Sequence, residues 1–322
     1  MIKQEHVYVP SDFHLVVLPT EKCNFRCLYC YESHEGEVMG KEVERALTAL
    51  LSRQILLRKK ILINWFGGEP LLRKGLIRRV SESVVEQVRN TPDVTYTGCM
   101  TTNGYLLDEQ TFLELLALGI NDFQITLDGP APLHDTMRPL ANGGKTFATI
   151  WKNLCFAKSC SEDFSVLIRV HYTPETIGQI YAFQKELVRT FGGDERFSFF
   201  FRPVSRLGGE NDACITSFSS AQRQEITEIL SARSGTQCCP IPEEYICYAA
   251  LPNSFGIRPN GELIKCTVAL DDPRNHVGWL TSRGELDIDA QKMQPWISGL
   301  LNGDGKACRC PLQDINASKN VL

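Results

Sequence analysis

Three cysteines near the amino terminus offer the clearest chemistry in this sequence. Cys23, Cys27 and Cys30 are separated by three and then two residues, directly after a short apolar segment. Thiolates at this spacing on one loop can bind three of the four irons of a 4Fe–4S cluster, which leaves the fourth iron open to a small-molecule ligand. The alternative is a structural zinc loop, but zinc normally takes four ligands, and of the residues that follow only His34 could supply the fourth.

Glycine-rich and polar motifs follow later apolar segments. Gly67-Gly68-Glu69-Pro70 ends the second segment, where glycines would let the backbone approach a ligand and a carboxylate can accept a hydrogen bond from an ammonium group. Taken alone, this motif is also typical of an ordinary turn. Thr101-Thr102-Asn103-Gly104 ends the third segment, and Leu127-Asp128-Gly129-Pro130 ends the fourth. Arg138 follows, either as a bidentate clamp for a carboxylate or as a surface arginine.

A second group of cysteines lies in the last quarter of the chain. Cys247 and Cys266 flank Gly261 at a spacing that a hairpin with a glycine turn would bring together. Six thiols in this region can fill one four-thiolate site, but not two. We therefore expect one site with Cys247, Cys266 and one cysteine from each of two pairs, Cys238/Cys239 (Cys239 preferred) and Cys308/Cys310. Zinc bound by the same thiolates is the alternative.

Alternating apolar and amphipathic segments must position these motifs. Short runs rich in Val, Ile, Phe and Thr predict six buried strands, and the stretches between them predict crossover helices. The expected strands are 13–20, 60–66, 94–102, 122–127, 165–172 and 196–203, and the expected helices are 38–57, 74–90, 108–118, 146–160 and 176–191. Six such units predict an α/β fold with a parallel sheet, open or closed into a barrel, whose chemistry lies at the carboxyl ends of the strands.

The regular alternation ends after about residue 201. A helix is expected over Ser219–Ala232, and a hairpin over Ile257–Lys265 with its turn at Pro259-Asn260-Gly261. The remainder is rich in cysteine, proline and glycine, which predicts a small irregular domain held together by metal. We divide the chain into a core domain, 1–215, and a tail domain, 216–322.

Composition narrows the class of protein. The 34 basic and 38 acidic residues give a net charge of −4, which argues against a nucleic-acid partner. No apolar run approaches the roughly 18 residues of a membrane span, and the first ten residues do not resemble a signal peptide. The expected location is the cytoplasm, where disulfides are disfavoured, so the 13 cysteines must serve packing, metal binding or thiol chemistry.

The loop Cys23-x3-Cys27-x2-Cys30, with the aromatic Tyr29, closely resembles the radical S-adenosylmethionine enzymes, and the other three motifs occur in that family's order. The resemblance covers residues 13–205 and implies a partial (β/α)6 barrel in which the reduced 4Fe–4S cluster cleaves S-adenosylmethionine to methionine and a 5′-deoxyadenosyl radical. The resemblance also implies contacts with the cofactor. Tyr29 would lie beside the adenine, Thr102 and Asn103 would contact the ribose, and the methionyl amino group would be bound by Gly67, Gly68, Glu69 and Pro70. Asp128 would be a further contact, and Arg138 would bind the methionyl carboxylate or a substrate carboxylate.

The spacing Cys247-x13-Gly261-x4-Cys266 resembles the opening motif of SPASM and twitch domains, although the later cysteine motif of a full SPASM domain is missing. This resemblance implies one auxiliary 4Fe–4S cluster and a precursor peptide as substrate, modified by a crosslink or by epimerisation. It also implies a one-electron reductant of the flavodoxin or ferredoxin type. With only about 12 residues before the first strand, we expect a peptide leader to be held by the barrel, by the tail or by a separate leader-binding protein.

Three other functions stay open. Anaerobic sulfatase maturases resemble this chain through the barrel, but they usually carry an aspartate base where Thr267 follows Cys266. Small-molecule dehydrogenation is the second alternative, and a non-enzymatic iron–sulfur or zinc module that binds a partner is the third. Cys99, Cys155 and Cys160 are expected in the core, whereas Cys214 is a candidate hydrogen donor, as in peptide epimerases of the resembled family, or else a free loop thiol.

Overall fold

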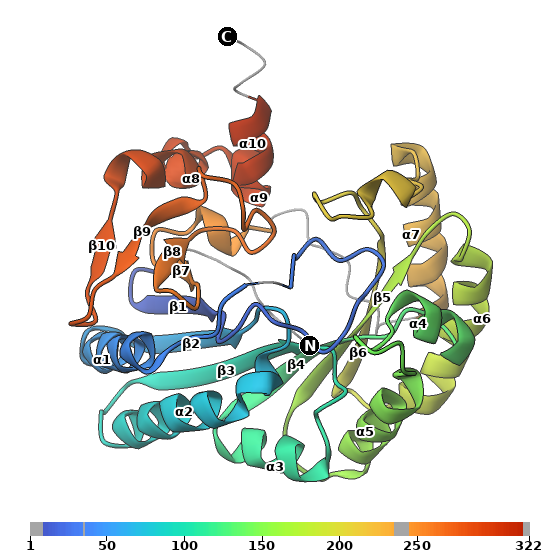
Figure 1. The fold of residues 1–322 in the computed structure, drawn as a ribbon, viewed down its shortest axis with the longest axis horizontal. Coiled ribbons are helices and arrows are strands. Elements are labelled where there is room, and N and C mark those ends of the chain that lie inside the picture. Colours follow the sequence, from blue (N-terminus) through green and yellow to red (C-terminus); the bar gives the residue numbers. More distant parts are fainter. Residues whose placement is uncertain (1–8, 35, 235–244, 318–322) are drawn as a thin grey trace. The chain divides into compact units, whose positions relative to one another are not determined.

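The computed structural model describes residues 9–34, 36–234 and 245–317, which group into two compact units that interleave along the sequence. The first unit contains residues 23–34 and 100–234, and the second contains residues 9–22, 36–99 and 245–317. Figure 1 shows the elements of both. The boundary between a core domain and a tail domain that the sequence predicts at residue 215 stays a prediction.

In the second unit, β1 (Asp12–Val17) is the strand around which the others assemble. It pairs in parallel with β2 (Lys60–Trp65) on one side and with β7 (Ser254–Ile257) on the other. The strand order is β10-β9-β8-β7-β1-β2-β3, in which β7 to β10 are antiparallel neighbours. The remaining strands are β3 (Thr95–Thr102, which continues into the first unit), β8 (Glu262–Ile264), β9 (His276–Leu280) and β10 (Leu286–Ile288).

Helices α1 and α2 connect the parallel strands of this unit, and three helices follow β10. Their bounds are α1 (Lys41–Leu57), α2 (Lys74–Arg89), α8 (Ala290–Asn302), α9 (Gly305–Arg309) and α10 (Pro311–Ala317), with short 3-10 turns η1 (Pro70–Arg73) and η4 (Tyr248–Ala250). The expected hairpin is confirmed by β7 and β8. The tail is more regular than its composition indicates, because Trp296 and Met293 of α8 and Val277 of β9 are buried in a small core.

In the first unit, the strand order is β3-β4-β5-β6, and β5 pairs in parallel with both β4 and β6. The strands are β4 (Ile120–Thr126), β5 (Ser165–Tyr172) and β6 (Phe197–Pro203), and the helices are α3 (Glu109–Ala117), α4 (Ala131–Met137), α5 (Phe147–Ser159), α6 (Ile177–Phe191) and α7 (Ser220–Ser234), with a 3-10 turn η2 (Asp212–Cys214). Helices α3, α5 and α6 run along the outside of these strands (Figure 1).

Local signals explain where elements begin and end. The Asp108 carboxylate accepts a hydrogen bond from the Thr111 amide at 2.9 Å and caps α3, and Gly119 follows that helix with φ +72°. In β5, alternate residues are buried against the helices, whereas Leu167, Arg169 and His171 are half-buried on the opposite, inner face. The six expected strands and five expected helices of residues 13–203 are thus confirmed, with α4 as an addition.

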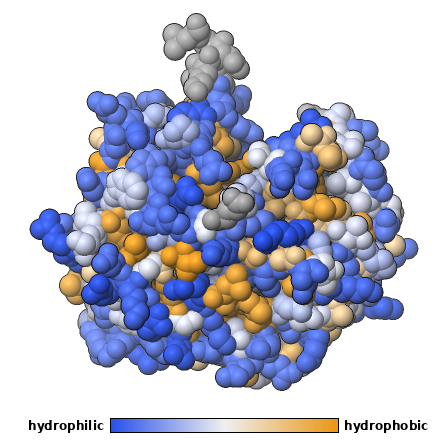
Figure 2. All heavy atoms as spheres, viewed as in Figure 1, coloured by the Kyte–Doolittle hydropathy of each residue, from blue (hydrophilic) through white to orange (hydrophobic). Residues whose placement is uncertain are grey.

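Polar and charged side chains cover most of the face shown in Figure 2, with smaller apolar patches between them. In the described part of the chain, no helix is both long and apolar enough to cross a membrane.

Candidate functional site

The loop with Cys23, Cys27 and Cys30 is held by backbone hydrogen bonds in the first unit. The Leu28 amide donates at 2.9 Å to the carbonyl of Met137, the last residue of α4, and the Arg26 amide donates at 2.9 Å to that of Pro139 just after it. The Cys30 amide donates to the Cys27 carbonyl at 3.1 Å, which closes a turn around the last two cysteines. The backbone therefore fixes this loop independently of any bound group.

The three thiols suit separate irons of a cluster. All three are half-buried, and burial raises the pKa of Cys27 and raises that of Cys30 to about 12, a cost that a bound cation would offset. Among residues 9–34, 36–234 and 245–317, no three His, Cys, Asp or Glu side chains converge on one metal ion. A mononuclear zinc site needs its ligands to converge on one ion, whereas in a cubane cluster each thiolate binds its own iron.

The Tyr29 hydroxyl lies in a buried polar network. It donates a short hydrogen bond to Asp128, accepts one from Arg138 Nη1 at 2.7 Å and lies 3.0 Å from His171 Nδ1. The rings of Tyr29 and His171 are 4.9 Å apart between centroids. The network therefore ties the cysteine loop to the carboxyl ends of β4 and β5, and it fixes the orientation of the aromatic ring expected beside the adenine.

Charge in this network is concentrated on Asp128 and Arg138. Burial alone would raise the pKa of the Asp128 carboxyl, but His171 and Arg138 outweigh it and hold that pKa well below its usual value. Burial lowers the pKa of His171 to about 4, so its imidazole is neutral at pH 7. The backbone amide of His171 donates to Asp128 Oδ1 at 2.9 Å, and His134 Nδ1 accepts from the Asp128 amide at 3.1 Å.

Arg138 is not a surface arginine. It is 7% exposed, and its guanidinium lies 5.7 Å from the centre of the Phe25 ring. Burial would lower its pKa, but Cys27, Tyr29 and Asp128 raise it well above the ordinary value. A permanent positive charge therefore lies beside the cysteine loop, where it favours thiolate over thiol at Cys27.

The Gly67-Gly68-Glu69-Pro70 motif follows β2 in the second unit and contacts the chain's own backbone. A Cβ on Gly67, which has φ +110°, would lie 2.3 Å from the Thr20 carbonyl oxygen, and one on Gly68 would lie 2.5 Å from that of Lys22. The Glu69 amide donates to the Lys22 carbonyl at 3.0 Å, and its buried carboxylate accepts from the Leu71 amide at 3.0 Å. The glycines thus support the segment that leads into Cys23, in addition to any contact with a ligand.

Thr102 and Asn103 end β3, as expected. The Thr102 hydroxyl accepts from the Gly104 amide at 3.1 Å. Asn103 Nδ2 donates to Asn24 Oδ1 at 2.8 Å and lies 3.9 Å from the Cys23 sulfur. Asn103 therefore contacts the cysteine loop, and an N–H group directed at a ligating sulfur is one of the factors that set a cluster's reduction potential.

Three tail thiols lie together in the second unit. Burial, together with the neighbouring Cys266 and Cys310 thiols, raises the pKa of Cys247 to about 11, and Cys310 likewise adds to the raised pKa of Cys266. The Cys308 thiol is buried, and burial and the Asp304 carboxylate raise its pKa. The Cys308 carbonyl accepts a hydrogen bond from the Cys247 amide at 2.9 Å. The structure therefore groups Cys310, not Cys308, with the hairpin cysteines, whereas Cys238 and Cys239 lie outside the described residues.

A buried lysine lies near Cys247. Lys265 is fully buried, and its Nζ donates to the carbonyls of Leu251 and Ser254 at 2.6 and 2.5 Å. Burial lowers its pKa to about 7, and the nearby Cys247 opposes that change. Beside it, the Tyr248 hydroxyl accepts from the Thr267 amide at 2.8 Å, so the residue after Cys266 is fixed by a phenol.

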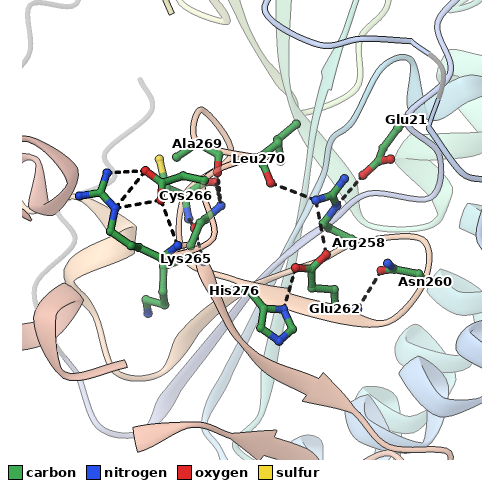
Figure 3. Close-up of polar contacts among 12 residues, drawn as sticks. Glu21, Arg258, Asn260, Glu262, Lys265, Cys266, Ala269, Leu270 and His276 are labelled. Atoms are coloured by element: carbon green, nitrogen blue, oxygen red, sulfur yellow. Dashed lines mark hydrogen bonds and ion pairs between the residues drawn. The ribbon is translucent and has the colours of Figure 1, made fainter. Parts of the chain in front are cut away.

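Charged residues connect the β7–β8 hairpin to neighbouring segments of the second unit. Arg258 donates to Glu21 Oε1 at 2.7 Å and to the Leu270 carbonyl at 3.0 Å, and it lies 3.4 Å from Glu262. Glu262 in turn contacts His276 Nδ1 at 2.6 Å. Figure 3 shows Arg258 directed between the two carboxylates. The hairpin between Cys247 and Cys266 is thus tied to the segment just before Cys23.

Cys214 ends η2 and is exposed. Its loop packs tightly on the cysteine loop of the same unit, since a Cβ on Gly209 would lie 2.2 Å from the Cys30 carbonyl oxygen. The candidate hydrogen donor therefore lies five residues from a direct contact with that loop.

Sequence reasoning missed Arg169 and His171. Both lie on the inner face of β5, and His171 contacts Tyr29 and Asp128. The signal was present, because Arg169-Val170-His171-Tyr172 alternates polar and apolar residues, which is typical of a strand with one polar face. This pattern was overlooked because the strand was interpreted as apolar and buried on both faces.

Comparison with known proteins identifies a family. The model of the radical SAM superfamily matches residues 17–185. An uncharacterized protein of Methanocaldococcus jannaschii is 28% identical over 177 residues, which are 54% of this chain and 58% of that protein. A serine-type anaerobic sulfatase-maturating enzyme of Klebsiella aerogenes is 27% identical over 168 residues, which are 50% of this chain and 41% of that enzyme. A GTP 3′,8-cyclase of Petrotoga mobilis is 30% identical over 145 residues, which are 43% of this chain and 41% of that enzyme. The chain thus spans less than two thirds of the length of each of these relatives.

Two solved structures resemble nearly the whole chain. anSMEcpe with bound AdoMet and the Kp18Cys peptide has a TM-score of 0.66 and 18% identity, covering 89% of this chain and 84% of that one. Streptococcus suis SuiB bound to the precursor peptide SuiA has a TM-score of 0.64 and 16% identity, covering 91% and 67%. At these identities the likeness establishes the fold, which includes the cysteine-rich tail.

Proposed function

Because the chain belongs to the radical SAM superfamily, we propose that it cleaves S-adenosylmethionine reductively and takes a hydrogen atom from a residue of a ribosomally made peptide. The observation that carries the first step is the backbone-fixed loop with three half-buried thiols beside Arg138. A 4Fe–4S cluster bound there would supply the electron that breaks the carbon–sulfur bond and yields the 5′-deoxyadenosyl radical.

The chain's own residues would bind and orient the cofactor. Tyr29 presents its ring while its hydroxyl is fixed by Asp128 and Arg138. Arg138 retains a buried Nε without a hydrogen-bond partner among the described residues, and we assign the methionyl carboxylate to this guanidinium. Glu69 and the preceding glycines are assigned to the methionyl ammonium, and Thr102 and Asn103 to the ribose.

A peptide substrate is supported by the solved structures of similar fold, since both carry bound peptides. We propose that hydrogen abstraction leads to a carbon–carbon, thioether or ether crosslink, or to epimerisation with Cys214 as the hydrogen donor. Formylglycine formation, as the name of the Klebsiella relative suggests, is less well supported, because the hydroxyl of Thr267 is engaged with Tyr248 at 2.9 Å and is no carboxylate base. The cyclase relative keeps a small-molecule substrate as the other candidate.

The tail thiols are proposed to bind one auxiliary 4Fe–4S cluster, with Cys247, Cys266 and Cys310 as ligands and Cys239 as the fourth. Support comes from the mutual proximity of the three described thiols and from Lys265, whose influence on Cys247 favours the thiolate. Such a group would receive the electron that leaves when a crosslink closes. An external one-electron reductant and, for a peptide leader, a separate binding protein complete the proposed partners.

The experiment is anaerobic reconstitution, followed by reduction with dithionite in the presence of S-adenosylmethionine and measurement of 5′-deoxyadenosine. Wild type and Cys155→Ala, a cysteine on the outer helix α5, should both form the product, whereas Cys27→Ala should not. A wild-type protein that contains iron but releases no 5′-deoxyadenosine would contradict the proposal. Incubation with candidate precursor peptides and mass spectrometry then tests the second step.

A further inference from the structure

Two arginines that the proposed function does not use share the inner face of the first unit. Arg169 lies on β5 with its side chain on the same face as His171, and the register pairs His171 with Arg202 of β6. Side chains two residues apart along a strand lie on the same face, so Arg169 and Arg202 are diagonal neighbours. Neighbouring strands are about 4.8 Å apart, so two long arginine side chains can reach one ligand.

Among the described residues, no carboxylate forms an ion pair with Arg169. Its Nε is buried and has no hydrogen-bond partner among the described residues. Asp128 is the carboxylate that affects it, and that group already accepts hydrogen bonds from Tyr29 and His171. Burial and the nearby Arg202 guanidinium lower the pKa of Arg169 to about 10, which still leaves it charged at pH 7.

Two adjacent guanidinium groups repel each other unless an anion lies between them. A partly buried charge without a partner is costly, and a carboxylate that accepts from both arginines would remove that cost. Arg202 is exposed and Arg169 is half-buried, so the pair extends from solvent inward. Tyr31, the residue after Cys30, is also close enough to influence Arg169, which places the inner arginine near the cysteine loop.

We propose that Arg169 and Arg202 form an anion site that binds a carboxylate of the substrate, either an aspartate or glutamate side chain or a carboxyl terminus. This inference rests on the proposed function and adds to it that the modified peptide is acidic next to the residue attacked. The methionyl carboxylate of the cofactor has the same chemistry, so the test must separate the two sources.

The test measures binding of two matched peptides to the reconstituted holoprotein with S-adenosylmethionine present. The probes are fluorescently labelled Ac-Gly-Glu-Gly-Glu-Gly-amide and its glutamine counterpart, followed by fluorescence anisotropy. We expect the acidic peptide to bind about tenfold more tightly to wild type, equivalent to about 1.4 kcal/mol. Arg169→Gln and Arg202→Gln should each bring the ratio close to one, and Arg202→Lys should retain part of it. Arg189→Gln, at an exposed position of α6, is the charge-matched control and should leave the ratio unchanged.

Equal binding of the two peptides by wild type overturns the proposal. So does an Arg169→Gln variant that binds S-adenosylmethionine more weakly while keeping the acidic preference, because the anion would then belong to the cofactor. If Arg169→Gln fails to fold, the exposed Arg202→Gln variant decides. Formation of 5′-deoxyadenosine without peptide is measured in parallel, so failure of the radical chemistry and failure of the anion site give different results.

Discussion

The cysteine loop of the first unit and the thiol group of the second differ in how they are assembled. Cys23, Cys27 and Cys30 come from eight consecutive residues, whereas Cys247, Cys266 and Cys310 come from the start of η4, the end of the β7–β8 hairpin and the end of α9. The first group is a property of one loop, and the second exists only when the tail has folded.

Each group also lies beside one buried cation, and the two cations differ. Arg138 is charged at any accessible pH and contacts Tyr29 and Asp128. Lys265 is held by two backbone carbonyls, and its pKa is lowered to about 7. The charge beside the first group is therefore permanent, while the charge on Lys265 near Cys247 depends on pH.

The largest effect should come from removing one thiol of each group. Cys27→Ala should lower 5′-deoxyadenosine formation by at least about 100-fold, because its thiolate would bind an iron of the cluster that cleaves the cofactor. Cys247→Ala should retain that activity and lose about four of about eight irons per chain. Iron and product are measured on the same reconstituted samples. Equal loss of product in both variants would show that the two groups are not separate sites.

A buried network should make the loop more sensitive than the tail to a neutral substitution. Asp128→Asn leaves Arg138 buried without its carboxylate, which should cost about 3 kcal/mol of unfolding free energy. Tyr29→Phe keeps the ring and removes only the hydroxyl, so about 1–3 kcal/mol is expected. Urea unfolding measures both. A loss below about 0.5 kcal/mol in both variants would mean that the network does not stabilise the loop.

The support beneath Cys23 can be tested at Gly67. Gly67→Ala would combine a strained φ of +110° with a Cβ 2.3 Å from the Thr20 carbonyl oxygen, so we expect a cost of more than about 2 kcal/mol and a drop in Tm. Gly143→Ala is the matched control, since it has φ +81° but open space around the added carbon, and it should cost about 1 kcal/mol. Similar Tm values for the two variants would remove the crowding argument.

The smallest effect should be the pH dependence that Lys265 adds to stability of the metal-free protein. Its pKa in the folded state, about 7, lies below that of an unfolded lysine, so between these values the unfolded chain binds one more proton. Stability should therefore rise as the pH increases above about 7, up to the pKa of unfolded lysine. Lys265→Met should flatten this rise, as measured by urea unfolding from pH 6.5 to 9.5. An unchanged slope would show that Lys265 stays charged in the folded protein.

The same contrast explains what the sequence could reveal. The strands and helices of residues 13–203 follow from local patterns and were predicted correctly, and the spacing of the three cysteines is equally local, although their role as cluster ligands stays a prediction. The proximity of Cys310 to the hairpin cysteines depends on how α9 packs, and the internal Pro295 makes α8 hard to recognise in the sequence. Arg169 was missed because β5 was interpreted as buried on both faces, although its alternation of polar and apolar residues indicates one polar face.

The pairing of β1 with β7 has a consequence for how the protein is made. One edge of β1 is covered by residues 254–257, which are synthesised more than 230 residues later. Until then, a nascent chain exposes the unpaired backbone groups of a largely apolar strand to any other strand in reach. Removing the tail would make that exposure permanent, so we expect a chain ending before Ser254 to aggregate instead of yielding an isolated barrel.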